Sequence, residues 1–291
     1  IIQSMGESFF DAFRNATLKL ERRIFLPHAK VYIFGEEVAR KGLINYIDFL
    51  QRDHETRRTA YVIIAKDCSA SEILKVHGGI EEIPSNYIKN LIEGYKFNSK
   101  ASQVMLLELL KDYYDEGKQP NIGIIQKMIK TEESILDNSK KEYELSVEGS
   151  AVFLEEKLIG FLDGLETRAV NFIKNKVQGG VVVSPSLNDE GTNVIELLKA
   201  KCQSNVEIKD EKAIVYIKVN ITGSLGEVNA KIDIKDPAVI ESIEKINSEV
   251  VKKEIENTIR KVQYEYGADI FGFGQIIHKK HPKDWKKVKS S

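Results

Sequence analysis

The sequence predicts an α+β protein of two consecutive domains, each a small β-sheet covered by helices. Three observations support this class. Helical and extended patterns alternate in the first half, two hairpin patterns follow in the second, and one long amphipathic pattern spans residues 237–266. Residues 130–143 are polar, charge-mixed and weakly periodic, so we place a boundary there. Residues 1–140 are then a helix-rich αβ domain, and residues 141–291 combine an antiparallel sheet with one long C-terminal helix.

The first half contains short helices and two strands. Apolar residues recur at three- and four-residue spacing over residues 6–25, as in an amphipathic helix. Residues 29–35 form a short strand that ends at Gly35, and a broken helix follows it. From Tyr61 to Ala65 nearly every residue is apolar, which favours a strand covered on both faces, as in a βαβ unit. Further helices are expected at 69–76, 84–93 and 101–116.

The strands of the second half form hairpins. Residues 145–162 predict a hairpin that turns near Glu155 and Glu156. Residues 206–223 alternate apolar and polar side chains, which predicts a second hairpin with one solvated face. Residues 227–234 alternate in the same way, so we expect another strand there.

Local signals mark the helix that follows the first hairpin. Asp163 followed by Glu166 is typical of a capping box, which predicts a helix over residues 164–176. The Gly179-Gly180 pair then separates this helix from the next strand.

A long helix begins at Asp236 and Pro237, since proline suits the first helical position. It is expected to run to about Tyr266. Its apolar stripe most simply covers a sheet, and a coiled-coil partner is the less favoured alternative. The stripe consists of Val239, Ile243, Ile246, Val250, Ile255, Ile259 and Val262.

The composition is that of a globular protein. Of the 291 residues 42% are hydrophobic and 30% charged, and 43 Lys+Arg nearly cancel 44 Asp+Glu. A formal charge of −1 gives no general reason to expect nucleic acid as a partner. No apolar run approaches the roughly 18 residues that a membrane helix needs. Cys68 and Cys202 lie far apart without a CxxC partner, so two buried free thiols are favoured over one disulfide.

Residues near the C-terminus pose the question of chemistry. Gly272-Phe273-Gly274 lacks the third glycine of a dinucleotide loop and the Lys-Ser/Thr of a phosphate loop, so a turn between helices is favoured. His278 and His281 have no carboxylate or thiol at ligand spacing, and lysines lie between them, so no metal is expected. No catalytic constellation stands out along the chain. The sequence therefore predicts no cofactor and argues against an enzyme, with an unrecognised hydrolase as the less favoured alternative.

Residues 278–289 carry six lysines against one aspartate. Beside an anionic bilayer such a run contributes about 1 kcal/mol per lysine. On these residues alone a solvated chain end is the simpler interpretation.

Four separated stretches resemble the Ger(x)C family, the C subunits of nutrient germinant receptors of endospore-forming bacteria. They are residues 21–53, 149–183, 217–228 and 269–289. In 149–183 the family pattern falls on Glu166, Thr167, Arg168, Gly179 and Gly180. In 269–289 it falls on Asp269, Ile270, Phe271, Gly272, Phe273, Gly274, His278, Pro282, Lys283 and Trp285.

The chain departs from the family at both ends. Family members begin with a lipoprotein signal, a lipidated cysteine and a first domain, and they continue past the Pro-Lys-x-Trp helix into another strand. None of these is present here. The resemblance therefore implies a fragment that holds the family's second and third domains.

The resemblance also implies a function. It predicts a non-catalytic, lipid-anchored subunit on the outer face of the spore inner membrane, beside the receptor's membrane-embedded A and B subunits. Such a subunit acts by protein–protein contacts when spores respond to nutrients. The alternative is a module that binds the nutrient itself, to which Glu166 and Arg168 could contribute. In the C-terminal motif, Gly272 and Gly274 are expected to turn the chain, while Phe271, Phe273 and Trp285 hold the last short helix against the long one.

Overall fold

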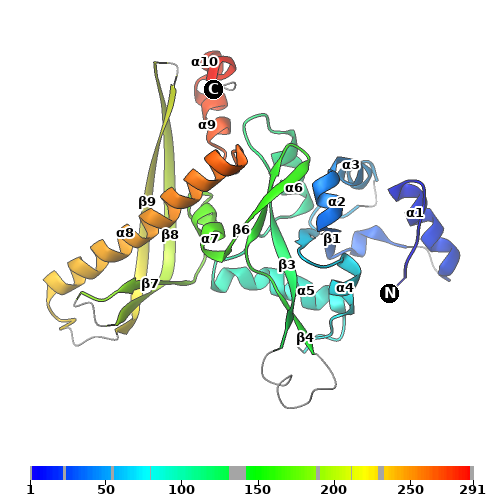
Figure 1. Cartoon of the computed structure of the whole chain (residues 1–291), viewed down its shortest axis with the longest axis horizontal. Coiled ribbons are helices and arrows are strands. Elements are labelled where there is room, and N and C mark those ends of the chain that lie inside the picture. The colour runs from blue at the N-terminus through cyan, green and yellow to red at the C-terminus, as the bar shows by residue number, and fades with distance from the viewer. Residues whose placement is uncertain are drawn as a thin grey trace.

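The structure is a computed structural model that describes residues 2–21, 24–53, 56–78, 80–130, 142–187, 191–210, 212–228 and 233–288. It contains two β-sheets with helices packed on them (Figure 1). Antiparallel hairpins and a long C-terminal helix are present, which confirms the predicted α+β class.

The first sheet mixes parallel and antiparallel strands. Its order is β1-β2-β3-β5-β6, with β4 pairing the far end of β3. The first three strands are parallel, and β5 and β6 join them antiparallel. The strands are β1 (Val31–Gly35), β2 (Tyr61–Ala65), β3 (Asn121–Ile129), β4 (Tyr143–Ser146), β5 (Ser150–Leu154) and β6 (Lys157–Leu162).

Helices cover both faces of this sheet. Every residue of β2 is buried, as the continuous apolar run predicted. Val62 and Ile64 share one core with α2, α3 and α6, whereas Ile63 and Ala65 share another with α4 and α5. The helices are α1 (Phe9–Ala16), which packs on α3, then α2 (Glu36–Lys41), α3 (Ile44–Arg52), α4 (Ala70–Lys75), α5 (Pro84–Glu93) and α6 (Leu106–Tyr114).

The second sheet is a long hairpin with one short added strand. Its order is β7-β8-β9, all antiparallel. Helix α8 crosses this sheet and packs against α7 and β7 (Figure 1). The elements are α7 (Gly164–Ile173), β7 (Val181–Pro185), β8 (Thr192–Lys209), β9 (Lys212–Val228), α8 (Pro237–Lys261), a π-helical turn (Val262–Tyr266), α9 (Phe273–Lys280) and α10 (Pro282–Val288).

Several predicted elements are confirmed. Helix α5 begins at Pro84, and Leu154 pairs with Lys157, so the first hairpin turns at Glu155 and Glu156. The second hairpin turns between Lys209 and Lys212. Cys68 and Cys202 are both free thiols as predicted, although each is partly rather than fully buried.

Other expectations differ from the structure. The first helix ends at Ala16, before a short 3₁₀ turn, and α6 begins at Leu106 rather than near 101. Strand β3 and the first half of β8 were not predicted. Strand β9 ends at Val228, and residues 229–232 of the expected 227–234 strand lie outside the described residues.

The predicted domain boundary falls beside residues 131–141, which lie outside the described residues. Strand β3 precedes this stretch, whereas β4, β5 and β6 follow it, and all four belong to the first sheet. The first sheet thus extends beyond residue 140. The division into residues 1–140 and 141–291 stays a prediction.

Candidate functional site

A tight turn links the end of α8 to α9. Gly267 and Gly272 have left-handed backbone angles (φ 59° and 85°), which glycine adopts without a steric cost. The Asp269 carboxylate accepts hydrogen bonds from the backbone N–H groups of Phe271 (3.0 Å), Gly272 (2.8 Å) and Gly274 (2.6 Å). This one side chain therefore fixes the conformation of the whole turn.

The turn contacts the loop between α6 and β3. The Gln119 N–H donates to the Asp269 carbonyl at 2.7 Å. A Cβ on Gly274 would lie 2.8 Å from the Gly117 carbonyl oxygen, and one on Gly117 would lie 2.4 Å from the Gln275 nitrogen. Neither position has room for a side chain. We call this contact between residues 115–119 and 269–275 the junction.

The aromatic residues of the motif pack in two places. Phe271 and Phe273 stack at 5.2 Å and belong to the core that includes Ile255 of α8. Trp285 packs instead with Val206 of β8 and with Ile277. The expectation that Trp285 holds the last helix against the long helix is therefore wrong, because the hairpin tip reaches that end of the molecule (Figure 1).

The two histidines and Pro282 make structural contacts in the last two helices. His278 stacks on Trp285 with ring centroids 5.2 Å apart. The His281 carbonyl accepts the N–H of Trp285 at 3.0 Å, and Pro282 begins α10. Among the described residues no group of three His, Cys, Asp or Glu side chains is placed to hold a metal ion.

The second group of predicted residues lies at the start of α7. Asp163 and Glu166 form the predicted capping box, with N–H to carboxylate distances of 2.8 and 2.9 Å. The Glu166 carboxylate also accepts two bonds from Lys261, both at 2.8 Å. The buried hydroxyls of Thr167 and Ser150 lie 2.9 Å apart.

Arg168 is almost fully buried, with 3% of its side chain exposed. Its guanidinium donates to both carboxylate oxygens of Glu254 at 2.7 and 2.9 Å and to the carbonyl of Val181. Arg168 thus joins α7, β7 and α8, while Glu166 joins α7 and α8. Both side chains considered for nutrient binding are used for contacts within the chain.

Gly179 and Gly180 lie against the loop that follows α5. A Cβ at Gly179 would lie 2.7 Å from the Lys96 carbonyl oxygen, and one at Gly180 (φ 119°) would lie 2.6 Å from that of Asn98. The Ser99 hydroxyl donates to the Gly179 carbonyl at 2.7 Å. The glycine pair is therefore a second close contact between the two halves of the chain.

A group of charged side chains surrounds the junction. Lys118 forms a 2.6 Å ion pair with Asp112. Although Lys174 is partly exposed, desolvation of its ammonium group, together with repulsion from Lys118, lowers its pKa to about 7. Burial raises the pKa of the Asp269 carboxyl, and its hydrogen bonds from the backbone oppose that shift.

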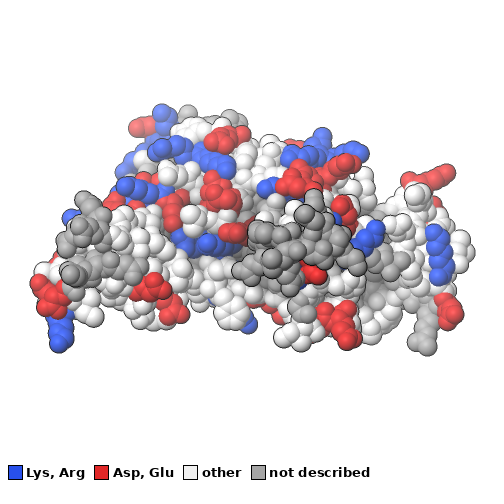
Figure 2. Space-filling model, turned by 60° about the horizontal axis from the view of Figure 1, so that its bottom comes forward, with Lys and Arg blue, Asp and Glu red and all other residues white. Residues whose placement is uncertain are grey.

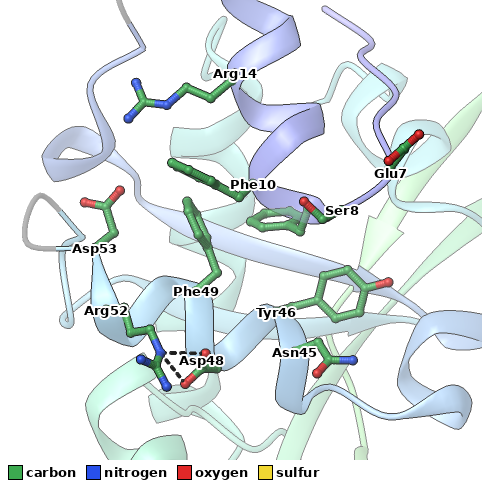
Figure 3. Close-up of a pocket in the computed structure, with 11 residues that line it drawn as sticks. Glu7, Ser8, Phe10, Arg14, Asn45, Tyr46, Asp48, Phe49, Arg52 and Asp53 are labelled. Atoms are coloured by element: carbon green, nitrogen blue, oxygen red, sulfur yellow. Dashed lines mark hydrogen bonds and ion pairs between the residues drawn. The ribbon is translucent and has the colours of Figure 1, made fainter.

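The N-terminal helix forms one wall of a groove of about 710 Å³. The ring of Phe49 on α3 lies 5.1 Å from Phe9 and 5.3 Å from Phe10, and Tyr46 lies 5.5 Å from Phe9. These rings form an aromatic floor between α1 and α3 (Figure 3). We call this hollow the α1–α3 groove.

Charged groups of both signs stand at the edge of the groove (Figure 3). The Arg14 guanidinium lies 5.0 Å from the centre of the Phe10 ring, and Arg52 pairs with Asp48 at 2.8 Å. Glu7 and Asp53 complete the edge. Ligand sites usually combine apolar walls with a few polar groups, and this groove has an aromatic floor with a larger polar share at its edge.

Sequence reasoning missed this groove. Residues 6–25 were predicted to be helical and apolar at regular spacing, but the partner of that apolar face was not identified. Three phenylalanines within one turn and a half, Phe9, Phe10 and Phe13, were the available signal. Pairing them with α3 requires the tertiary structure.

Two family descriptions match the chain. "Spore germination protein N-terminal domain" matches residues 1–127, and "Spore germination B3/GerAC like, C-terminal" matches residues 148–291. The chain is 24% identical to spore germination protein KC of Bacillus subtilis (strain 168), over 98% of this chain and 72% of that protein. It is 26% identical to spore germination protein YndF of the same strain, over 100% of this chain and 69% of that protein.

A solved structure shows the same fold. The crystal structure of the GerBC protein matches with a TM-score of 0.65 at 20% identity, over 96% of this chain and 78% of that one. The two domain matches, over residues 1–127 and 148–291, define a spore germination protein. The chain belongs to the Ger(x)C family, as its sequence motifs predicted. No helix among the described residues is long and apolar enough to cross a bilayer.

Proposed function

We propose that the chain is a non-catalytic subunit of a membrane-bound nutrient germinant receptor and acts through protein–protein contacts. The observation that carries this proposal is the use of the family motif residues. Asp269, Gly274 and Arg168 all contact other parts of the same chain instead of surrounding a reaction centre. These residues build a rigid body, which suits a protein that presents surfaces to partners.

The motif contacts also connect the two sheets. The junction joins the loop before β3 to the segment before α9, and the Gly179-Gly180 pair joins the loop after α5 to β7. When a partner binds and displaces one half of the chain, the close-packed backbone at these two contacts therefore passes the displacement to the other half. This connection supports a role in which the chain transmits the effect of one subunit's binding to another subunit.

The family resemblance supplies the proposed location and partners. In this proposal the chain lies on the outer face of the spore inner membrane, next to the receptor's A and B subunits. A lipid anchor of the kind that the family resemblance implies would hold it there. No nucleic acid is involved in this proposal, and the net charge of −1 agrees with that.

Germination of spores that lack the gene tests the proposal. Loss of optical density is followed after each nutrient and after calcium dipicolinate, a trigger that bypasses receptors. We expect the response to one nutrient class to disappear while the response to calcium dipicolinate is kept. Normal germination with every nutrient, also after deletion of the remaining receptors, would contradict the proposal.

The α1–α3 groove favours a second candidate, direct binding of the nutrient. Its aromatic floor and its edge with Arg14 and Glu7 would suit a small molecule that carries both charges, such as an amino acid. Melting of the purified chain is measured with candidate nutrients, beside a Phe49→Ala variant. A shift that the variant lacks supports binding, and equal shifts in both chains contradict it.

A further inference from the structure

The last two helices have one apolar and one basic side. Ile277 of α9 and Trp285 of α10 are buried against Val206 of the hairpin. On the other side the lysines reach solvent. Those with described and exposed side chains are Lys279, Lys280, Lys283 and Lys287. We call them the basic surface.

The basic surface is held by the fold. Trp285 is 7% exposed and stacks on His278, and the Lys280 ammonium donates to the Asn205 side chain of β8 at 2.8 Å. At its start α9 is fixed by the junction, where Gly274 touches Gly117. A solvated chain end would show no such anchoring. The lysines are therefore displayed in fixed relation to the rest of the molecule.

Charge is segregated here to a degree not found on α8. Residues 273–288 contain five lysines and a single acidic residue, Asp284. The 25 residues of α8 contain five basic and five acidic residues. Positive and negative side chains are likewise interspersed on the face drawn in Figure 2. The basic surface is thus locally positive, although the chain as a whole has a formal charge of only −1.

We propose that the basic surface binds the anionic headgroups of a lipid bilayer. The inference rests on the proposed membrane location and adds the surface of the chain that faces the lipid. The basic side chains of this surface are lysines and not arginines, which favours a lipid partner over an acidic protein. Paired recognition of protein carboxylates is the role of arginine, whose planar fork matches them, whereas residues 261–291 contain lysine and no arginine. Lysine acts as a point charge that diffuse headgroup charge attracts without defined geometry.

Vesicle co-sedimentation of the purified chain tests the proposal. Vesicles of phosphatidylcholine alone are compared with an equal mixture of phosphatidylcholine and phosphatidylglycerol. The test variant replaces Lys279, Lys280 and Lys283 by glutamine. The control variant replaces Lys245, Lys252 and Lys253 of α8, which removes the same charge from a surface of mixed sign.

The chain is expected to bind only the anionic vesicles. Each lysine near the surface contributes about fivefold, so the test variant should bind about 100-fold more weakly. The control variant should keep most of the binding. About 1 M salt should abolish binding, because the Debye length falls to about 3 Å.

Two results would overturn the inference: no binding to anionic vesicles, or an equal loss in both variants. If the chain binds polyglutamate but not the vesicles, the surface belongs to an acidic protein instead. None of these results would affect the gene-deletion test, so the two proposals can fail separately.

Discussion

The junction and the α1–α3 groove differ in what their side chains contact. At the junction the Asp269 carboxylate is saturated by backbone donors, and two glycines bring backbones into contact. In the groove Phe9 and Phe10 remain 39% and 47% exposed, and their partners are other rings. The family motif thus marks internal structure. The rings of the groove, in contrast, leave an aromatic surface open to solvent.

The largest expected effect is at Arg168, the other buried motif contact. Arg168→Met leaves Glu254 as a partly buried carboxylate without its partner, which costs about 3–5 kcal/mol of unfolding free energy. Thermal and urea unfolding measure the change. As a control, Arg52→Met breaks an exposed pair with Asp48 and should cost less than about 1 kcal/mol. Equal losses of unfolding free energy in the two variants would show that the buried Arg168–Glu254 pair matters no more to stability than an exposed pair.

Gly274→Val should be next in size. The added side chain meets the Gly117 carbonyl and the Trp285 ring, and overpacking of this kind costs about 1–3 kcal/mol. Gly94→Ala is the matched control, because a Cβ added at Gly94 would have nothing within 4 Å and the φ of −64° suits alanine. Unchanged melting of Gly274→Val would argue against the junction.

Lys174 predicts a pH dependence of stability. Its pKa is about 7 in the folded chain, below the value of an unfolded lysine, so the unfolded state binds more protons between pH 7 and the unfolded pKa. Stability should therefore rise with pH from about 7 to 9. Lys174→Met should flatten this rise, as measured by urea unfolding at both pH values. A rise of the same size in the variant would assign the effect to other groups.

Local contacts were predictable from the sequence, and contacts between distant residues were not. The capping box joins Asp163 to Glu166, three residues on, and Asp236 caps α8 in the same local way. Arg168 and Glu254 are 86 residues apart, and nothing in their spacing indicates a pair. The family resemblance identified Gly274 but could not show that Gly117 fills the space of its missing side chain.

The missed strands have identifiable causes. In β8 register shifts at Val194/Ile195 and Leu197/Lys199 interrupt the alternation of apolar and polar residues that predicts a strand. In β3 the apolar run is short, and such a run cannot be told from a buried helical segment by periodicity alone. Both strands are fixed by pairing with neighbours. That information lies elsewhere in the chain.

The smallest expected effect on stability is in the groove. Phe10→Ser removes an exposed ring and its contact with Arg14, which should change the unfolding free energy by less than about 1 kcal/mol. Phe97→Ser is the matched control, because Phe97 is 74% exposed beneath Lys96 and lies outside the residues that line the groove. Both variants should melt alike.

In spores the two variants should differ. If partners or nutrients use the groove, Phe10→Ser slows the nutrient response at normal protein level, and Phe97→Ser does not. A large loss of stability in Phe10→Ser would instead show that the rings of the groove, like the residues of the junction, contribute to the packing of the chain itself. The comparison between the two regions would then fail, because exposure of an aromatic ring would no longer indicate a surface kept for a partner.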